Sequence, residues 1–153
     1  MVIRVKKKKT IMCQSRGIRN CNPLNIRRSK THWKGETPSD SPSMGRTPDR
    51  EFVQFESMEW GVRAAFCLLR TYRDKYKAVC IEDIITRWAS PTENDTRRYI
   101  CDVCRLTGFG GKERLTESEW PQLIAAMARI ECGASLPEET IKKGYKLYKN
   151  SNA

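Results

Sequence analysis

The sequence predicts a mainly α-helical protein of the α+β class with one short β element. After residue 57, apolar residues recur at helical spacing in several segments that are bounded by capping and stop residues. The stretch "EFVQF" at residues 51–55 is instead typical of a short strand. The chain has 153 residues and is 39% apolar, which suffices for one domain with an ordinary core. We therefore expect a single domain over residues 13–153.

Positive charge is concentrated at the N-terminal end. Residues 1–32 carry ten of the 29 Lys and Arg residues and none of the 18 Asp and Glu residues, so the remainder of the chain is close to neutral. We expect residues 1–12 to form a solvated, disordered basic arm. Such an arm suits an anionic envelope polymer, a carrier protein or nucleic acid. No later helix shows a one-sided run of Lys and Arg, so nucleic acid is the partner that the sequence favours least.

Turn-forming residues dominate between the arm and the strand. Residues 36–50 contain three Pro and three Ser and predict an exposed loop. Residues 15–35, "SRGIRNCNPLNIRRSKTHWKG", are rich in Asn, Gly and Pro and predict loops and tight turns. The apolar anchors of these turns are expected to be Ile18, Leu24, Ile26 and Trp33.

Three helices are expected between the strand and residue 108. Ser57 can cap the first, and Pro91 stops the second, which covers residues 80–89. Thr92 or Asn94 can cap the third, which ends near Gly108. Helical spacing predicts buried faces made of Trp60, Ala64, Ala65, Leu68, Leu69 and Tyr72 in the first helix and of Ile81, Ile84, Ile85 and Trp88 in the second.

The fourth helix carries the residue of greatest interest. It opens at Thr116 with Glu119 three residues later, which is the capping-box spacing, and Gly133 ends it. A short fifth helix is expected over residues 138–149. The fourth helix has an apolar stripe at helical spacing, which consists of Trp120, Leu123, Ile124, Met127 and Ala128. The next position along this stripe is Glu131.

Glu131 thus places a carboxylate where the pattern requires an apolar side chain. Burial and the negative end of the helix dipole both disfavour its ionised form, so we expect a carboxylic acid that keeps its proton near neutral pH. A general acid for glycosidic bond cleavage needs this environment, because it must hold a proton until the leaving oxygen takes it. The alternative is structural: either the helix phase is shifted by one residue, or Arg129 or a lysine of the fifth helix pairs with Glu131.

The cysteines indicate neither a metal site nor a disulfide framework. Cys101 and Cys104 form a CxxC within an expected helix, but no second CxxC exists and the single histidine, His32, is distant in sequence. We expect no metal and no cofactor. Three others are expected to be small buried apolar residues rather than half-cystines: Cys67, Cys80 and Cys132.

Export and membrane insertion have no signal in this sequence. No segment approaches the roughly 18 apolar residues of a membrane helix, and "MVIRVKKKKTIM" lacks the apolar stretch of a secretion signal. We expect a protein that is made in the cytoplasm. If it acts outside the cell, it is expected to be associated with a virion or delivered to the cell envelope by another component.

Several segments resemble the lysozyme-like superfamily, especially bacterial glucosaminidases and lytic transglycosylases. "LIAAMARIECG" at residues 123–133 resembles the helix of that family that ends in a catalytic Glu followed by Ser/Cys-Gly. "RNCNPLNIR" with "HWKG" is similar to its Asn-rich loop and Trp-x-Gly, although Pro-Leu-Asn replaces the Phe-Gly. "FVQFESMEWGVRAAFCLL" resembles its strand-to-helix piece, and "PTENDTRRYICDV" its Ala-Thr-Asp-Pro-x-Tyr segment.

This resemblance spans roughly residues 16–133 and implies a circular permutation. In the glucosaminidases the catalytic helix precedes the Asn-rich loop, whereas here it follows it. Permutation is compatible with a compact domain whose termini lie close together. The expected fold is therefore a lysozyme-like helical domain in permuted order.

The resemblance also implies roles for individual residues. Glu131 would be the general acid, and Tyr99 would line the sugar site and orient the reacting N-acetyl group. Glu93 and Asp95 are candidates for a second carboxylate, which is dispensable if the acetamide assists or an anhydro sugar forms. Asp95 also suits the first turn of a helix, and Glu93 is equally suited to solvent. Further candidates for sugar binding are Asn22, Asn25, Asn94, Thr96 and Trp33, although Asn in turns often bonds its own backbone and Trp33 fits a core position.

The sequence also resembles a group of small phage and mobile-element proteins that are often described as structural. These carry "RGIRNxNPxNI", then a Trp, then "ENDT" and a Tyr, as this chain does. Two functions are therefore weighed. One is a peptidoglycan-cleaving glycosidase or lytic transglycosylase, whose partners would be peptidoglycan or another anionic envelope polymer and a phage or secretion-machine carrier protein. The other is a non-catalytic phage structural or binding protein on the same scaffold.

Overall fold

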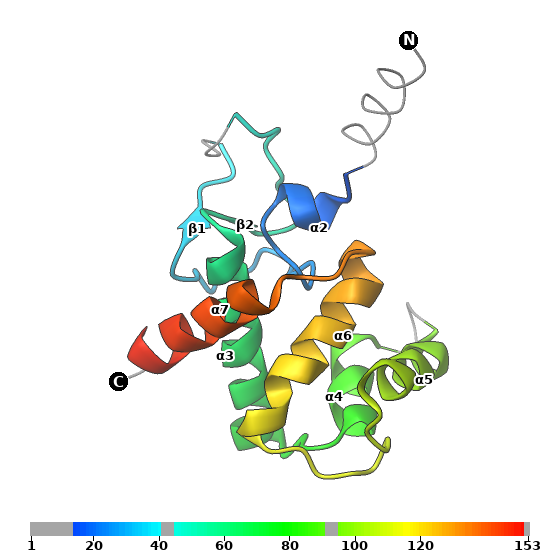
Figure 1. Cartoon of the computed structure of the whole chain (residues 1–153). Helices are drawn as coiled ribbons and strands as arrows, with labels where there is room; N and C mark the ends of the chain where they lie inside the picture. The colour runs from blue at the N-terminus through cyan, green and yellow to red at the C-terminus, as the bar shows by residue number, and fades with distance from the viewer. Residues whose placement is uncertain (1–13, 41–44, 91–94, 152–153) are drawn as a thin grey trace.

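The computed structural model describes residues 14–40, 45–90 and 95–151, so the expected basic arm at residues 1–12 lies outside the described part. This part is mainly helical, with six α-helices and a small two-stranded antiparallel sheet (Figure 1), which confirms the predicted fold class. None of its helices is long and apolar enough to cross a lipid bilayer. In chain order the elements are α2 (Arg16–Arg19), β1 (Glu36–Thr37), β2 (Gln54–Phe55), α3 (Met58–Tyr76), α4 (Ile81–Trp88), α5 (Thr96–Thr107), the 3-10 turn η1 (Glu117–Glu119), α6 (Trp120–Cys132) and α7 (Glu138–Ser151).

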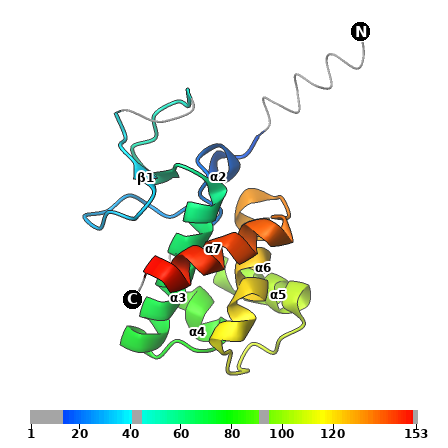
Figure 2. The same cartoon turned by 60° about the vertical axis from the view of Figure 1, so that its left-hand side comes forward.

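The helices are arranged around one apolar core. α3 begins beside the sheet and runs to the opposite end of the molecule, and α6 runs back so that its C-terminal end lies next to α2 (Figure 1). α4 and α5 pack against each other, α5 also packs on α6, and α7 lies across α3 (Figures 1 and 2). Buried side chains from the loop after α2, from β2 and from all helices between α3 and α7 form a single hydrophobic cluster. This arrangement brings the end of α6 close to the loop that follows α2.

Helix starts follow the predicted capping chemistry with one correction. The hydroxyl of Ser57 accepts a hydrogen bond from the backbone N–H of Trp60 at 3.4 Å, as expected for the cap of α3. The cap of α5 is Asp95, whose carboxylate accepts from the backbone N–H of Arg98 at 3.1 Å. The sequence had favoured Thr92 or Asn94, both of which lie outside the described residues. An ionised Asp at this position also suits the helix dipole, which explains why it serves as the cap.

α6 ends where the sequence predicts, but it begins at Trp120, because the first turn of the expected helix, which Thr116 opens, is the 3-10 turn η1. The backbone N–H of Thr116 donates to the Glu119 carboxylate at 2.9 Å, and the 3-10 turn that this bond closes leads directly into α6. Gly133, with a left-handed φ of 70°, ends the helix. The predicted apolar stripe is buried at every position: Trp120, Leu123, Ile124, Met127 and Ala128.

The N-terminal region has one short helix that was not expected, and its strand is shorter than expected. Residues 16–19 form the short helix α2, capped by Ser15, where only turns were predicted. Within the expected strand at residues 51–55, only Gln54 and Phe55 pair with β1, while Phe52 forms an isolated bridge with Arg27. The interrupted pairing nevertheless ties the loop after α2 to the segment before α3.

The three cysteines expected to be buried are buried. Cys67, Cys80 and Cys132 have at most 9% of their surface exposed. Burial, followed by the nearby Glu131 carboxylate, raises the pKa of Cys132 to about 11, so this thiol is neutral at physiological pH. It donates to the backbone carbonyl of Pro23 at 3.1 Å, which fixes the end of α6 against the loop after α2.

The crossing of α7 over α3 depends on Gly144. A Cβ at this position would lie 2.3 Å from Cγ1 and 2.6 Å from Cβ of Val62, which is fully buried on α3. Val62 cannot rotate away easily, because β-branched side chains in helices have one strongly preferred rotamer. We expect Gly144→Ala to lower the free energy of unfolding by about 1–3 kcal/mol, measured by urea denaturation.

Gly110→Ala provides the matched control, because Gly110 is exposed and its added Cβ would meet nothing closer than 3.7 Å. Helix propensity alone would make alanine at position 144 more stable by about 1 kcal/mol. Unchanged or increased stability of Gly144→Ala would therefore show that the two helices do not approach as closely as described.

Candidate active site at the end of α6

Glu131 lies half-buried in the last turn of α6 and accepts three hydrogen bonds from neutral side chains of three other elements. Its Oε2 accepts from the hydroxyl of Tyr99 on α5 at 2.9 Å and from Nε1 of Trp88 on α4 at 3.2 Å. Its Oε1 accepts from Nδ2 of Asn25, in the loop after α2, at 3.2 Å. None of the ion pairs within the described residues involves Glu131, so Arg129 and the lysines of α7 are not its partners there.

Glu131 also faces a surface pocket of about 470 Å³, which is within the range of small-molecule sites. The carboxylate is thus not enclosed in the core, although the stripe that leads to it is. Seven residues from the loop after α2, the segment before β2 and helices α3, α4 and α6 line this pocket: Asn25, Arg27, Phe52, Tyr72, Trp88, Ala89 and Glu131.

The loop that carries Asn25 is fixed by another asparagine. Asn22 is fully buried, donates through Nδ2 to the carbonyls of Ile26 and Val53, and accepts from the backbone N–H of Ile26. Asn25 adopts a left-handed φ of 52°, a conformation that Asn tolerates better than most residues. The side chain of Asn22 is committed to the loop, so its predicted contact with a sugar has no support in this placement.

Tyr99 stays protonated next to the carboxylate. Burial, followed by the negative charge of Glu131, raises the pKa of Tyr99 far above its usual range. The phenol is therefore a hydrogen-bond donor at every working pH, and its bond to Oε2 orients the Glu131 side chain. The resemblance had implied that Tyr99 lies at the site, and the structure brings Tyr99, Asn25 and Glu131 together; their roles toward a substrate stay predictions.

The other candidate residues that the structure describes do not converge on Glu131. Thr96 is 8% exposed and donates to the carbonyl of Ala89, and Asp95 is committed to capping α5. Trp33 is half-buried and lines a different pocket of about 460 Å³ beside β1. Glu93 and Asn94 lie outside the described residues.

Five pocket residues were not singled out as site residues by the sequence: Arg27, Phe52, Tyr72, Trp88 and Ala89. Trp88 was expected only on the buried face of α4, yet its indole N–H donates to Glu131. A buried indole N–H usually finds an acceptor, so a Trp at the end of an amphipathic helix was a usable signal. The isolated bridge between the backbones of Arg27 and Phe52 brings these two residues together, and the sequence does not indicate which residue pairs with Phe52.

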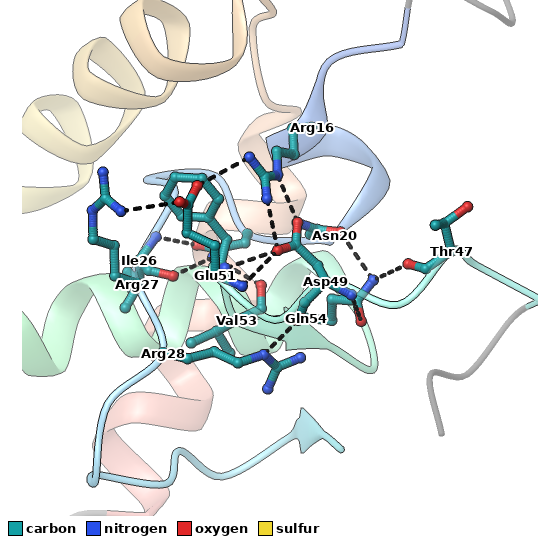
Figure 3. Close-up of polar contacts among 12 residues, drawn as sticks. Arg16, Asn20, Ile26, Arg27, Arg28, Thr47, Asp49, Glu51, Val53 and Gln54 are labelled. Carbon is teal, nitrogen blue, oxygen red and sulfur yellow. Dashed lines mark hydrogen bonds and ion pairs between the residues drawn. The ribbon is translucent and has the colours of Figure 1, made fainter. Parts of the chain in front are cut away.

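A buried carboxylate anchors the segment before β2 beside this pocket. Asp49 is 6% exposed and accepts from Arg16, whose Nε and Nη2 lie 2.6 and 2.8 Å from its two oxygens, and from Asn20 at 2.9 Å (Figure 3). It also accepts from the backbone N–H groups of Glu51 and Phe52. Residues 36–50, expected as an exposed loop, therefore end in an ordered turn that fixes the position of Phe52 at the pocket.

Comparison with known proteins places the chain in a phage family. No family model matches it, but it is 38% identical over 135 residues to Protein P5 of Pseudoalteromonas phage PM2. The alignment covers 86% of this chain and 80% of Protein P5. The chain belongs to the Protein P5 family. The phage context implied by the sequence is thus confirmed through a P5 relative, whereas membership in the lysozyme-like superfamily is not shown.

Proposed function

We propose that this P5-family protein cleaves the glycan strands of peptidoglycan, as a glycosidase or lytic transglycosylase in which Glu131 is the general acid. The observation that supports it best is a carboxylate at the end of a buried apolar stripe that faces a pocket and is held by three neutral donors instead of an ion pair. A structural salt bridge would have left no group able to deliver a proton. The sequence resemblance to glucosaminidases and lytic transglycosylases adds the substrate class.

In the proposed reaction, Glu131 protonates the glycosidic oxygen as the bond from that oxygen to the anomeric carbon breaks. Oε2 already accepts two hydrogen bonds and Oε1 only the one from the Asn25 side chain, so Oε1 is the better position for the transferable proton. The anomeric carbon is then attacked by the acetamide oxygen to give an oxazolinium that water later opens, by the C6 hydroxyl to give an anhydro sugar, or directly by water. In the first two routes the Glu131 carboxylate, which has given up its proton, takes the proton that the water or the C6 hydroxyl loses. The first two routes need no second carboxylate from the protein.

A second candidate function is a structural or binding protein of the phage particle without turnover. The same three hydrogen bonds also favour this function, because they fix the carboxylate between α4, α5 and the loop after α2, as a purely structural contact would. The basic N-terminal segment would then serve to bind an anionic envelope polymer or a carrier protein.

Incubation of the purified full-length protein with isolated peptidoglycan distinguishes the two functions. We expect muropeptides in the supernatant. A product lighter by one water indicates the transglycosylase, and for hydrolysis the fragment masses after borohydride reduction show whether the reducing end is N-acetylmuramic acid or N-acetylglucosamine. Failure of the folded protein to release fragments from several types of wall would support the non-catalytic function.

Tyr99→Phe tests whether the hydroxyl orients the acid. The substitution removes one hydrogen bond to Oε2 and leaves the ring in place, so we expect kcat for wall cleavage to fall about 10- to 100-fold with little change in KM. Tyr72→Phe is the matched control, since Tyr72 lines the same pocket but is not among the donors to Glu131 in the described contacts. Equal effects of the two substitutions would contradict an orienting role for Tyr99.

A further inference from the structure

Among the described residues that line the pocket at Glu131, one has a cationic side chain, Arg27. Of the seven residues that line it, Arg27 and Glu131 alone are charged, and the remaining lining is aromatic, amide or methyl. A glycan that enters to reach Glu131 therefore meets a guanidinium at the edge of the same pocket. A neutral polysaccharide offers this guanidinium no negative charge with which to form an ion pair.

Arg27 is held at this edge by its surroundings. Its guanidinium carbon lies 5.1 Å from the ring centroid of Phe52, and the backbones of the two residues form the isolated bridge. Arg16 also lies against this ring, at 4.4 Å, and Figure 3 shows Arg16 and Arg27 directed toward Glu51 from two sides. Since Arg16 is anchored on the buried Asp49, Phe52 is a fixed support for the Arg27 side chain.

The present partner of Arg27 is weak enough to be exchanged. Its Nη1 lies 3.6 Å from the Glu51 carboxylate, and the two side chains are 65% and 52% exposed. Exposed pairs of this kind contribute little, whereas a guanidinium can hold a ligand carboxylate through two parallel hydrogen bonds. Glu51 has a second partner in Arg16 at 3.1 Å, so it is not left unpaired when Arg27 turns to a ligand.

We propose that Arg27 binds a carboxylate of the glycan and thereby selects acidic, peptidoglycan-type strands over neutral N-acetylglucosamine polymers. This rests on the proposed function, because it assigns a specificity to the same pocket. The carboxylate comes either from the lactyl ether of the sugar, when the peptide is absent, or from the stem peptide. Both present the same planar, charged group to the guanidinium.

Binding without turnover provides the test. All variants are made in full-length Glu131→Gln, which is expected to bind without cleaving. Binding is measured by co-sedimentation at physiological ionic strength with three polymers: intact peptidoglycan, peptidoglycan strands stripped of peptides by an amidase, and chitin. Arg27→Gln is added to this background, and Arg114→Gln is the matched control, since Arg114 is exposed in the loop between α5 and η1 and its substitution removes the same charge. Arg27→Lys retains the charge but not the paired hydrogen bonds. Circular dichroism checks the fold of each variant.

We expect Arg27→Gln to weaken binding about tenfold on at least one carboxylate-bearing polymer and to leave chitin binding unchanged, with Arg27→Lys intermediate and Arg114→Gln without effect. If Arg27→Gln weakens binding to intact walls alone, the partner of Arg27 is the peptide carboxylate. If it weakens binding to stripped strands alone, the partner is the lactyl carboxylate. Equal loss on chitin, equal loss from Arg114→Gln, or no loss on either acidic polymer would overturn the proposal. The proposed function is tested separately, by the release of muropeptides by the wild-type protein, so failure of one proposal can be told from failure of the other.

Discussion

Glu131→Gln is expected to abolish release of muropeptides, with a rate at least about 1000-fold below that of the wild type. The substitution keeps the shape of the side chain but removes the carboxyl group, the only one among the described residues that line the pocket, and the amide that replaces it cannot deliver a proton near neutral pH. The measurement is the mass-resolved wall assay, run with equal amounts of folded protein.

The structure also indicates that this variant folds. Its new carbonyl oxygen can accept from Tyr99 and Trp88 as Oε2 does now. Its new NH₂ group would face the NH₂ group of Asn25, but the Oδ1 of Asn25 is buried without a partner within the described residues. A flip of the Asn25 amide therefore turns this oxygen toward the new donor. Unchanged circular dichroism together with lost cleavage is the expected combination, and retained cleavage would remove Glu131 from the mechanism.

An exposed carboxylate controls for a general effect of charge. Glu138→Gln makes the same chemical change in the first turn of α7, where the side chain is 85% exposed and outside the pocket. We expect it to cleave walls at the wild-type rate. A comparable loss in both variants would mean that the total charge of the protein, through attraction to the polymer, governs the assay.

The helices and the position of Glu131 could be predicted because both follow from local rules. Capping at Ser57 and Thr116, the stop at Gly133 and the apolar spacing of α6 depend only on residues a few positions apart. That spacing placed Glu131 at the end of a buried stripe. Tyr99 was assigned through a family resemblance, since nothing in the period of α5 predicts a contact with α6.

The rest of the site depends on which segments meet in space. The bridge between Arg27 and Phe52 joins residues on either side of a long loop, so its register has no local signal. Asn22 and Thr96 were assigned to a substrate, but both instead satisfy nearby backbone groups. Short polar side chains commonly bond the backbone of turns and helix starts, and here that local chemistry took precedence over the predicted role.

Asp49→Ala is expected to have the largest effect on stability. It removes the acceptor of Arg16, Asn20 and the backbone N–H groups of Glu51 and Phe52, so several donors lose this partner, and one of them, the Asn20 amide, belongs to a fully buried residue. The side chain of Arg16 is 43% exposed and can regain water, so the loss is smaller than for a fully buried pair. We expect the free energy of unfolding to fall by about 3 kcal/mol at pH 7, measured by urea denaturation. Asp40→Ala is the control, because it makes the same chemical change at an exposed position in the preceding loop. We expect it to lower the free energy of unfolding by less than about 0.5 kcal/mol.

The dependence of this loss on pH identifies its electrostatic part. Burial alone would raise the pKa of Asp49, but the hydrogen bonds from Arg16, Phe52, Asn20 and Glu51 outweigh burial and hold this pKa well below its usual range. A carboxylate with a depressed pKa stabilises the folded state above its unfolded pKa of about 4 and loses that contribution as the pH falls toward the folded value. The stability difference between the wild type and Asp49→Asn should therefore be constant near neutral pH and narrow progressively below about pH 4. A difference that is the same at pH 3 and pH 7 would mean that Asp49 acts through its shape and neutral hydrogen bonds, and that its charge does not hold Phe52 at the pocket.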